Sequence, residues 1–223
     1  MKLIAIDGAC YHNGKPDSVA CGAFVALDND NDKQVVRDDI KHGTLIEDGG
    51  TNQRGELLGL AAALKYIVDH PGNFLVVTDS EYIFNAMTKD WVHNWQSNHW
   101  LTSAGETVKN IDLWQEIYKL KCDVDRVCED APCFYHIKGH VISFGTVTRQ
   151  RLLEADPTGF KLLIEMLNKY DRDIDYCQEK VDKAQECSVK NNGFEFEPKQ
   201  LKRFVVLNML ADAFASSRVE IYK

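Results

Sequence analysis

The chain has 223 residues, 44% of them hydrophobic, and carries a net charge of −8 with an isoelectric point near 5.4. This length is enough to bury a full core, and no apolar run approaches the roughly 20 residues that cross a bilayer. The acidic balance works against long-range attraction to polyanions. The seven cysteines are irregularly spaced, and Met1-Lys2 leads directly into an apolar run. We therefore expect reduced thiols, no signal peptide and a cytoplasmic protein that does not contact membranes.

The N-terminal part predicts three strands followed by a helix. Short apolar runs bounded by Asn, Asp and Gly read as strands joined by turns. The predicted strands cover residues 2–7, about 19–27 and about 33–41. Thr51 or Asn52 can cap the helix that follows, in which leucines and alanines recur at helical spacing until Pro71-Gly72.

The remaining chain alternates strands and helices. We expect a buried strand at 74–78, parallel to the first, then helices near 80–96 and 110–121, a short strand at 134–137, and a last helix at about 198–216. The pattern predicts an α/β fold. Its mixed five-stranded sheet has three antiparallel strands followed by parallel ones, and helices flank it.

Three carboxylates stand at the ends of these elements. Asp7 and Asp79 each end an apolar run, and Glu56 lies near the start of the first helix. Grouped carboxylates resist ionisation unless a cation joins them, and oxygen ligands suit Mg²⁺ or Mn²⁺. The pattern points to metal-assisted phosphoryl-transfer chemistry. The alternative, that each acid is a cap or a turn residue, would be sufficient for a single Asp after a strand.

The motifs around these acids resemble the type 1 ribonuclease H family. They are Ile6-Asp7-Gly8-Ala9-Cys10, Thr51-Asn52-Gln53-Arg54-Gly55-Glu56-Leu57, Thr78-Asp79-Ser80-Glu81-Tyr82, Lys138-Gly139-His140 and Asn208-Met209-Leu210-Ala211-Asp212-Ala213-Phe214-Ala215. Residues 91–114, which hold all four tryptophans, resemble the substrate-binding handle of bacterial and animal members. The handle region 89–121 has four basic and four acidic residues, whereas the family's handle is often rich in lysine.

The resemblance implies an enzyme that cuts the RNA strand of RNA–DNA hybrids. Asp7, Glu56, Asp79 and Asp212 would bind two Mg²⁺ ions, for which Mn²⁺ can substitute, with Asp7 bridging both. The products would carry 5′-phosphate and 3′-hydroxyl ends. Asp156 competes with Asp212 for the fourth ligand position; the amphipathic Asn-x-x-Ala-Asp-x-x-Ala setting favours Asp212.

His140 corresponds to the family's histidine near the attacking water or the departing phosphate. Imidazole titrates near neutral pH, which suits proton transfer. The family pattern continues with a glycine two residues later, where this chain has Ile142. A loop histidine bonded to a carbonyl is the alternative.

Six further residues are candidates for substrate binding. Amide side chains would read the minor groove of the hybrid, two residues would hold a DNA phosphate with help from Arg54, and a tryptophan would pack against a DNA sugar. Turn formation, helix capping and helix packing are the alternative roles. The minor-groove candidates are Asn13, Asn52 and Gln53. The phosphate candidates are Thr51 and Asn110, and the sugar-packing candidate is Trp95.

Between His140 and Asp212 lies a segment much longer than the family's usual loop. We interpret 1–223 as a single ribonuclease H-like domain with a helical insertion, most simply a hairpin, at 141–200. We expect a monomer and leave open a protein partner that binds the insertion. Two other functions remain alternatives: a different nuclease of the same broad fold, or a catalytically weak module that binds nucleic acid or protein.

Overall fold

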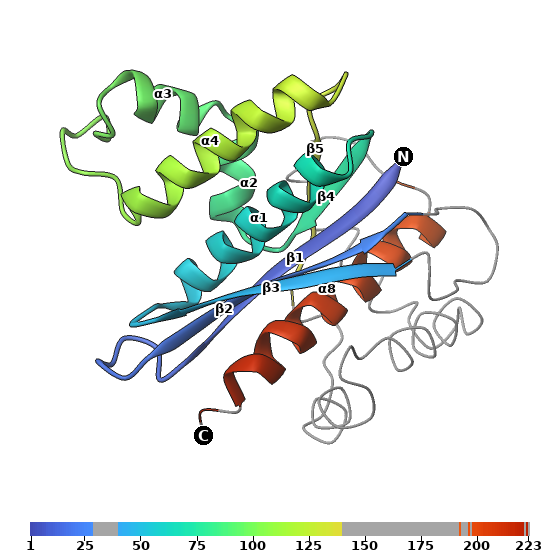
Figure 1. Ribbon diagram of the computed structural model, residues 1–223, viewed down its shortest axis with the longest axis horizontal. Coiled ribbons are helices and arrows are strands. Elements are labelled where there is room, and N and C mark those ends of the chain that lie inside the picture. Colours follow the sequence, from blue (N-terminus) through green and yellow to red (C-terminus); the bar gives the residue numbers. More distant parts are fainter. Residues whose placement is uncertain (29–39, 140–191, 193–195, 197, 221, 223) are drawn as a thin grey trace.

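The structure, a computed structural model, describes residues 1–28, 40–139, 192, 196, 198–220 and 222 (Figure 1). Its centre is a five-stranded sheet with the order β3-β2-β1-β4-β5. The first three strands, β1 (Lys2–Tyr11), β2 (Val19–Leu27) and β3 (Ile40–Asp48), pair antiparallel. β4 (Phe74–Thr78) pairs parallel to β1, and β5 (Cys133–His136) pairs parallel to β4. The predicted mixed sheet is confirmed.

Helices cover both faces of the sheet (Figure 1). α1 (Asn52–Asp69), α2 (Glu81–Thr88) and α4 (Ile111–Val127) share a core with one face. α8 (Pro198–Glu220) packs against the other face. The short helix α3 (Trp91–Ser97) lies between α2 and α4 in the chain and projects with them away from the sheet.

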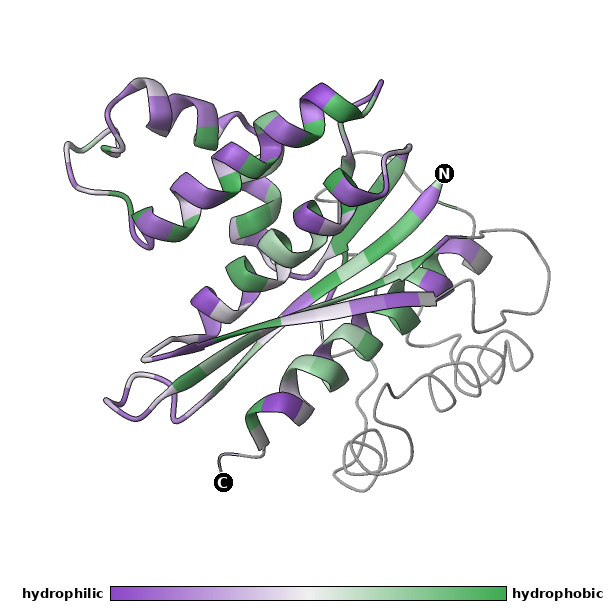
Figure 2. Ribbon diagram, in the orientation of Figure 1, coloured by the Kyte–Doolittle hydropathy of each residue, from purple (hydrophilic) through white to green (hydrophobic). Residues whose placement is uncertain are grey.

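The alternation of side chains in β1 creates the two cores. Leu3 and Ala5 point into the core with α8, whereas Ile4 and Ile6 point into the core with α1, as the period of two in a strand requires. In Figure 2 the central strands are largely hydrophobic, while β3 at the edge carries hydrophilic residues. Helices on both faces therefore bury the middle of the sheet, where Asp7 lies.

Glycines bring α1 unusually close to the sheet. Gly8 and Gly22 face each other across β1 and β2. A Cβ on Gly8 would lie 2.1 Å from the Glu56 backbone nitrogen, and one on Gly22 would lie 1.9 Å from the Gly59 nitrogen. Any side chain at these positions would push the helix outward. This contact holds Glu56 against the segment of β1 that carries Asp7.

Two predicted elements were misplaced. The strand expected at 33–41 overlaps β3 only at its end, because β3 runs from Ile40 to Asp48 to pair with the whole of β2; residues 33–39 lie outside the described part. The helix expected at 80–96 is two helices, α2 and α3. Asp90 interrupts it with a left-handed φ of 55°, a backbone conformation that ends a right-handed helix.

The segment interpreted as a helical insertion lies outside the described residues, apart from Asn192, Phe196 and the start of α8. Its helical content and the single-domain assignment remain predictions. Among the helices that the structure describes, none is both long enough and apolar enough to span a membrane.

Candidate active site

Four carboxylates approach one another near the middle of the sheet. Asp7 lies on β1, Glu56 in the second turn of α1, Asp79 directly after β4, and Asp212 on α8. Asp7 is only 7% exposed. Burial raises its pKa well above the usual value, and the charges of Asp79, Asp212 and Glu56 raise it further, against a lowering by the Gly8 N–H. Elements from both sides of the sheet thus bring together the four acids that the sequence predicts.

Neighbouring donors orient the carboxylates around Asp7. The Gly8 N–H donates to Asp7 Oδ1 at 2.6 Å. Asn208 Nδ2 donates from α8 to Asp7 Oδ2 at 3.4 Å and to the Ile6 carbonyl at 3.3 Å. Asn208 therefore fixes the position of α8 against β1 as well as the carboxylate.

The other acids also have local partners. The Ser80 hydroxyl donates a short hydrogen bond to Glu56 Oε2, and the Ser216 hydroxyl donates to Asp212 Oδ1 at 3.0 Å. Among the described residues, no three His, Cys, Asp or Glu side chains form a ready-made ligand set.

This donor set fits a divalent metal. The three charged groups that raise the pKa of Asp7 beyond the effect of burial are all carboxylates, and hard oxygen ligands suit Mg²⁺ and Mn²⁺. Burial and three neighbouring like charges make ionisation of Asp7 unfavourable. A bound cation would offset this unfavourable electrostatic energy. The residues are thus suited to the metal site that the sequence predicts.

Asp79 lies against the end of β5. A Cβ on Gly139 would be 1.9 Å from Asp79 Oδ2, so the backbone there directly contacts the carboxylate. His136 Nε2 lies 3.2 Å from the Asp79 carbonyl oxygen. Burial lowers the pKa of His136. The Asp79 carbonyl and the charges of Asp79 and Glu81 act in the opposite direction, but their effect is smaller, so the pKa lies below its usual value. His140 and the competing Asp156 lie outside the described residues, so the roles predicted for them remain predictions.

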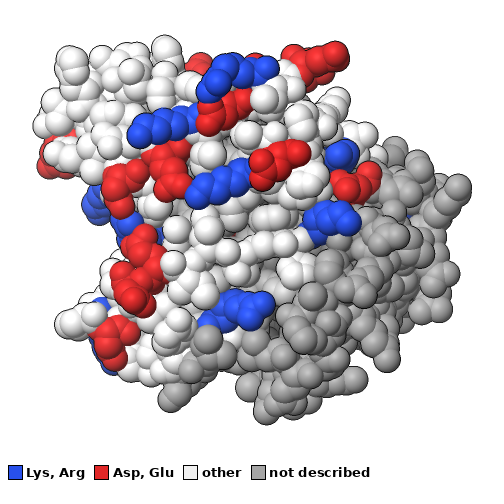
Figure 3. All heavy atoms as spheres, in the orientation of Figure 1, with Lys and Arg blue, Asp and Glu red and all other residues white. Residues whose placement is uncertain are grey.

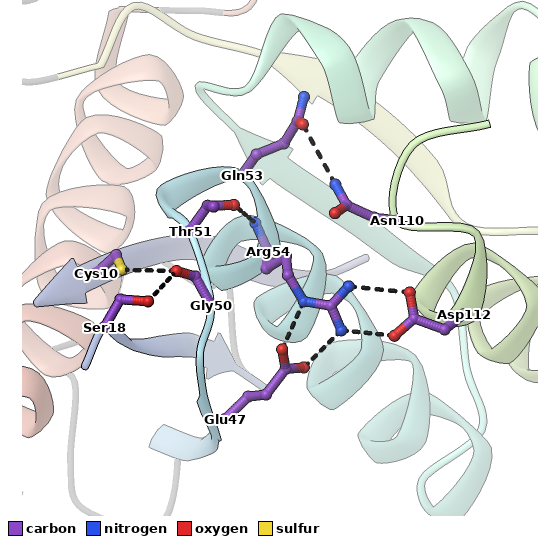
Figure 4. Close-up of polar contacts among 9 residues, drawn as sticks. All are labelled: Cys10, Ser18, Glu47, Gly50, Thr51, Gln53, Arg54, Asn110 and Asp112. Carbon is purple, nitrogen blue, oxygen red and sulfur yellow. Dashed lines mark hydrogen bonds and ion pairs between the residues drawn. The ribbon is translucent and has the colours of Figure 1, made fainter. Parts of the chain in front are cut away.

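The N-terminus of α1 gathers five of the six predicted substrate residues, three of which, Thr51, Gln53 and Asn110, are drawn in Figure 4. Thr51 Oγ1 caps the helix by accepting from the Arg54 N–H at 3.2 Å. Asn110 Nδ2 donates to Gln53 Oε1 at 3.3 Å, which joins α1 to the start of α4. On the other side, the Asn52 N–H donates to Asn13 Oδ1 at 3.2 Å. We call this group, Asn13, Thr51, Asn52, Gln53 and Asn110, the amide rim.

Arg54 serves the fold at the amide rim. Its guanidinium forms paired hydrogen bonds with Glu47 on β3 (2.5 and 2.8 Å) and with Asp112 on α4 (2.9 and 2.6 Å) (Figure 4). These bonds raise the pKa of Arg54. Help from Arg54 with a DNA phosphate is therefore disfavoured, because two carboxylates already engage its donors and neutralise its charge.

Trp95, the sixth candidate, lies apart from the amide rim. Its ring packs against Trp114 (5.3 Å between centroids) and Trp91 (6.0 Å). It also lines a cavity of about 550 Å³, whose walls contain no charged residue. The surface over α3 is almost without charged atoms (Figure 3). Trp114 is fully buried and donates to the Tyr82 hydroxyl at 2.7 Å, so its role is helix packing.

Comparison with known proteins decides the family. The ribonuclease H family model matches residues 2–145. The chain belongs to the ribonuclease H family. It is 34% identical over 155 residues to the ribonuclease H of Jannaschia sp. strain CCS1, covering 70% of this chain and 90% of that one. It is 31% identical over 162 residues to that of Rickettsia bellii, covering 72% and 92%.

The fold agrees with this membership. The solution structure of the PFV RNase H domain aligns with 72% of this chain and 94% of that one, with a TM-score of 0.50 at 21% identity. Ribonucleases H are metal-dependent, which agrees with the donor set around Asp7. The family match ends at residue 145, so the position of Asp212 beside Asp7 rests on the structure.

Three residues of this ribonuclease H site were not predicted from sequence. Ser80 follows Asp79 and reaches Glu56, and Asn208 lies one helical turn before Asp212 and reaches Asp7. His136 contacts Asp79 from β5. Spacing could have indicated Asn208, since residues four apart share a helix face. Nothing in the sequence indicates that Ser80 or His136 meets an acid from another element.

Proposed function

We propose that the protein hydrolyses the RNA strand of RNA–DNA hybrids, leaving 5′-phosphate and 3′-hydroxyl ends. The observation that carries this proposal is the approach of Asp79, Asp212 and Glu56 to Asp7, whose pKa is raised by burial and then by these charges, in a chain of the ribonuclease H family. Such a cluster disfavours the metal-free fold, so its best explanation is a cation-dependent function.

Asp7, Glu56, Asp79 and Asp212 would hold the metal, which we propose to be two Mg²⁺ ions with Mn²⁺ as a substitute. Ions held there would supply activation of the attacking water and neutralisation of charge at the leaving oxygen. The chain itself provides the alignment of the acids. Asn208 keeps one Asp7 oxygen directed at α8, and Ser80 fixes the rotamer of Glu56.

The amide rim and Trp95 would bind the hybrid. The amides of Asn52 and Gln53 provide donors and acceptors for 2′-hydroxyls and base edges, without the charge that would bind any phosphate equally. Thr51 and Asn110 are proposed to hold a DNA phosphate, and Trp95 a deoxyribose. The capping and pairing bonds that these side chains make hold the rim in place before substrate arrives.

We further propose a cytoplasmic monomer. The five described cysteines are all free thiols, which suits a reducing compartment. The large hydrophobic residues exposed in the described part come from different elements, at Met1, Ile46, Leu101, Val127 and Tyr222, which supports a monomer, because interfaces usually expose a contiguous apolar patch. Size-exclusion chromatography with light scattering tests this; a dimer mass would contradict it.

The test of the activity is cleavage of an RNA–DNA hybrid carrying a labelled RNA strand, with Mg²⁺, by wild type, Asp7→Asn and Asp212→Asn. We expect only the wild type to cut, and only the RNA strand of the hybrid. Double-stranded RNA and double-stranded DNA are the control substrates.

Cutting of DNA would favour a different nuclease of this fold, and binding without cutting under Mg²⁺ or Mn²⁺ would favour a binding module. Undiminished cutting by Asp212→Asn would place the fourth ligand elsewhere.

A further inference from the structure

β5 ends beside the proposed metal site and forms an edge of the sheet. It has four residues, and among the strands that the structure describes it pairs only with β4. The Ile137 N–H donates to the Thr78 carbonyl at 3.0 Å, so that the backbone N–H and C=O of the preceding residue, His136, point away from β4. An edge strand this short is weakly held unless something satisfies those groups.

The side chain of Asn192 satisfies both. Asn192 Oδ1 accepts from the His136 N–H at 2.8 Å, and Asn192 Nδ2 donates to the His136 carbonyl at 2.8 Å. A carboxamide that makes this pair of bonds substitutes for one residue of a neighbouring strand. The residue lies 56 positions away from His136 in sequence.

A second contact attaches the same part of the chain to β5. Phe196 packs edge-on against Tyr135 at 4.9 Å between ring centroids and against Phe204 on α8 at 4.9 Å. Tyr135 is itself buried. Asn192 and Phe196 therefore engage two consecutive residues of β5, one by hydrogen bonds and one by ring packing.

Asp79 depends on the position of this strand end. The His136 ring meets the Asp79 carbonyl at 3.2 Å, and the backbone at Gly139 leaves no room for a Cβ beside the Asp79 carboxylate. A small movement of residues 136–139 would therefore move that carboxylate or give it an additional rotamer.

We infer that Asn192 is a positioning residue for the active site: by closing the edge of β5 it holds His136 and Gly139 in place, and through them the Asp79 carboxylate. Asn192, which lies a few residues before α8, thereby contributes to the alignment of a proposed metal ligand. This inference rests on the proposed function, because it assigns Asp79 to metal binding.

The experiment compares wild type with Asn192→Ala, which removes both hydrogen bonds, and with Asn192→Asp, which keeps an acceptor for the His136 N–H and loses the donor. Asn73→Ala is the matched control, since Asn73 is exposed and precedes β4 at the end opposite to Asp79. Three quantities are measured well below the melting temperature: hydrogen exchange of the His136 amide, the Mg²⁺ concentration for half-maximal cleavage, and kcat and KM for the hybrid.

In Asn192→Ala we expect faster exchange at His136, a kcat about tenfold lower, a several-fold higher Mg²⁺ requirement and an unchanged KM, in the range usual for groups that orient metal ligands. Asn192→Asp should lie between this variant and wild type, and Asn73→Ala should match wild type. A purely structural role would lower the melting temperature without changing the Mg²⁺ requirement.

Two results overturn the inference. The first is faster His136 exchange with kcat and Mg²⁺ dependence like wild type, and the second is unchanged His136 exchange. If Asn192→Ala does not fold, Asn192→Asp decides by the same measurements. Failure of the wild type to cut would instead contradict the proposed function, whereas the exchange measurement on Asn192→Ala would still show whether Asn192 closes the edge.

Discussion

The carboxylate cluster and the amide rim both include residues from the N-terminal part of α1, yet they relate to stability in opposite ways. At the cluster, Asp7 is buried among like charges, which penalise its ionised form. At the rim, Thr51 caps α1, Gln53 pairs with Asn110, and Arg54 joins β3 to α4. The difference indicates that the proposed metal ligands destabilise the fold when no metal is bound, whereas the proposed substrate-binding residues also stabilise it.

The largest effect is expected from Asp7→Asn. Cleavage should fall by about a thousandfold or more, equivalent to about 4 kcal/mol, while the metal-free protein should become more stable at neutral pH. Each unit by which the fold raises the Asp7 pKa costs about 1.4 kcal/mol once the group is ionised. Thermal melting in the presence of a chelator measures this gain, and added Mg²⁺ should raise the melting temperature of wild type only.

The pH dependence has a definite sign. The folded pKa of Asp7 is raised above the usual 3.8, so its contribution to stability is fully present below that value and is lost as pH rises through the folded pKa. The stability difference between Asp7→Asn and wild type should therefore grow with pH and vanish in acid. A constant difference would mean that Asp7 is not electrostatically penalised.

Gly22→Ala tests whether close packing by glycines brings α1 to the cluster. Its Cβ would meet the Gly59 backbone nitrogen at 1.9 Å, and we expect a loss of about 3 kcal/mol in the free energy of unfolding, with reduced cleavage as Glu56 shifts. Gly14→Ala is the control: it has open space but a φ of 78°, so a loss of about 1 kcal/mol without an effect on cleavage is expected. Chemical denaturation compares the two, and equal losses would contradict the packing argument.

Ser80→Ala separates orientation of an acid from helix capping. The hydroxyl donates to Glu56 and also accepts from the Ile83 N–H at 3.4 Å, capping α2. We expect kcat to fall about tenfold because Glu56 is no longer held, and stability to fall by about 1 kcal/mol because the cap is lost. Ser80→Thr, which keeps the hydroxyl, should restore most of both. Steady-state kinetics and denaturation curves measure the two effects. A loss of stability with an unchanged kcat would contradict the proposal that Ser80 orients Glu56.

The smallest effect is expected at the handle. Trp95→Ala should raise the KM for the hybrid several-fold, consistent with about 1–2 kcal/mol for a lost aromatic contact with nucleic acid. The dependence of KM on salt should not change, because the cavity beside Trp95 contains no charged residue. Trp95→Phe is the control that keeps an aromatic face. A changed salt slope would show that the handle acts through ionic contacts after all.

The sequence by itself determined the sheet, the order of its elements and the acids. The apolar runs that lead to Asp7 and Asp79 predict two parallel strands that bring these acids together, and these local patterns do not depend on the rest of the chain. Asp7 does not end its strand as predicted, because β1 continues to Tyr11 in its pairing with β2. It also limited the cap of the first helix to Thr51 or Asn52, because capping is a local interaction, and the structure selects Thr51. It did not specify where β3 begins, because pairing with β2 sets the bounds of that strand. It also did not specify that Asp90 separates α2 from α3, because the left-handed backbone at Asp90 is a feature of the folded chain.

Only the tertiary structure decided which neighbours hold the acids. Ser80 reaches Glu56, Asn208 reaches Asp7, and Asn192 reaches β5, in each case across tens of residues or more. The sequence also could not show that Arg54, beside the amide rim, has its donors engaged by Glu47 and Asp112. A residue type and its spacing indicate what a side chain can bond, whereas the partner that it bonds depends on which elements the fold packs together.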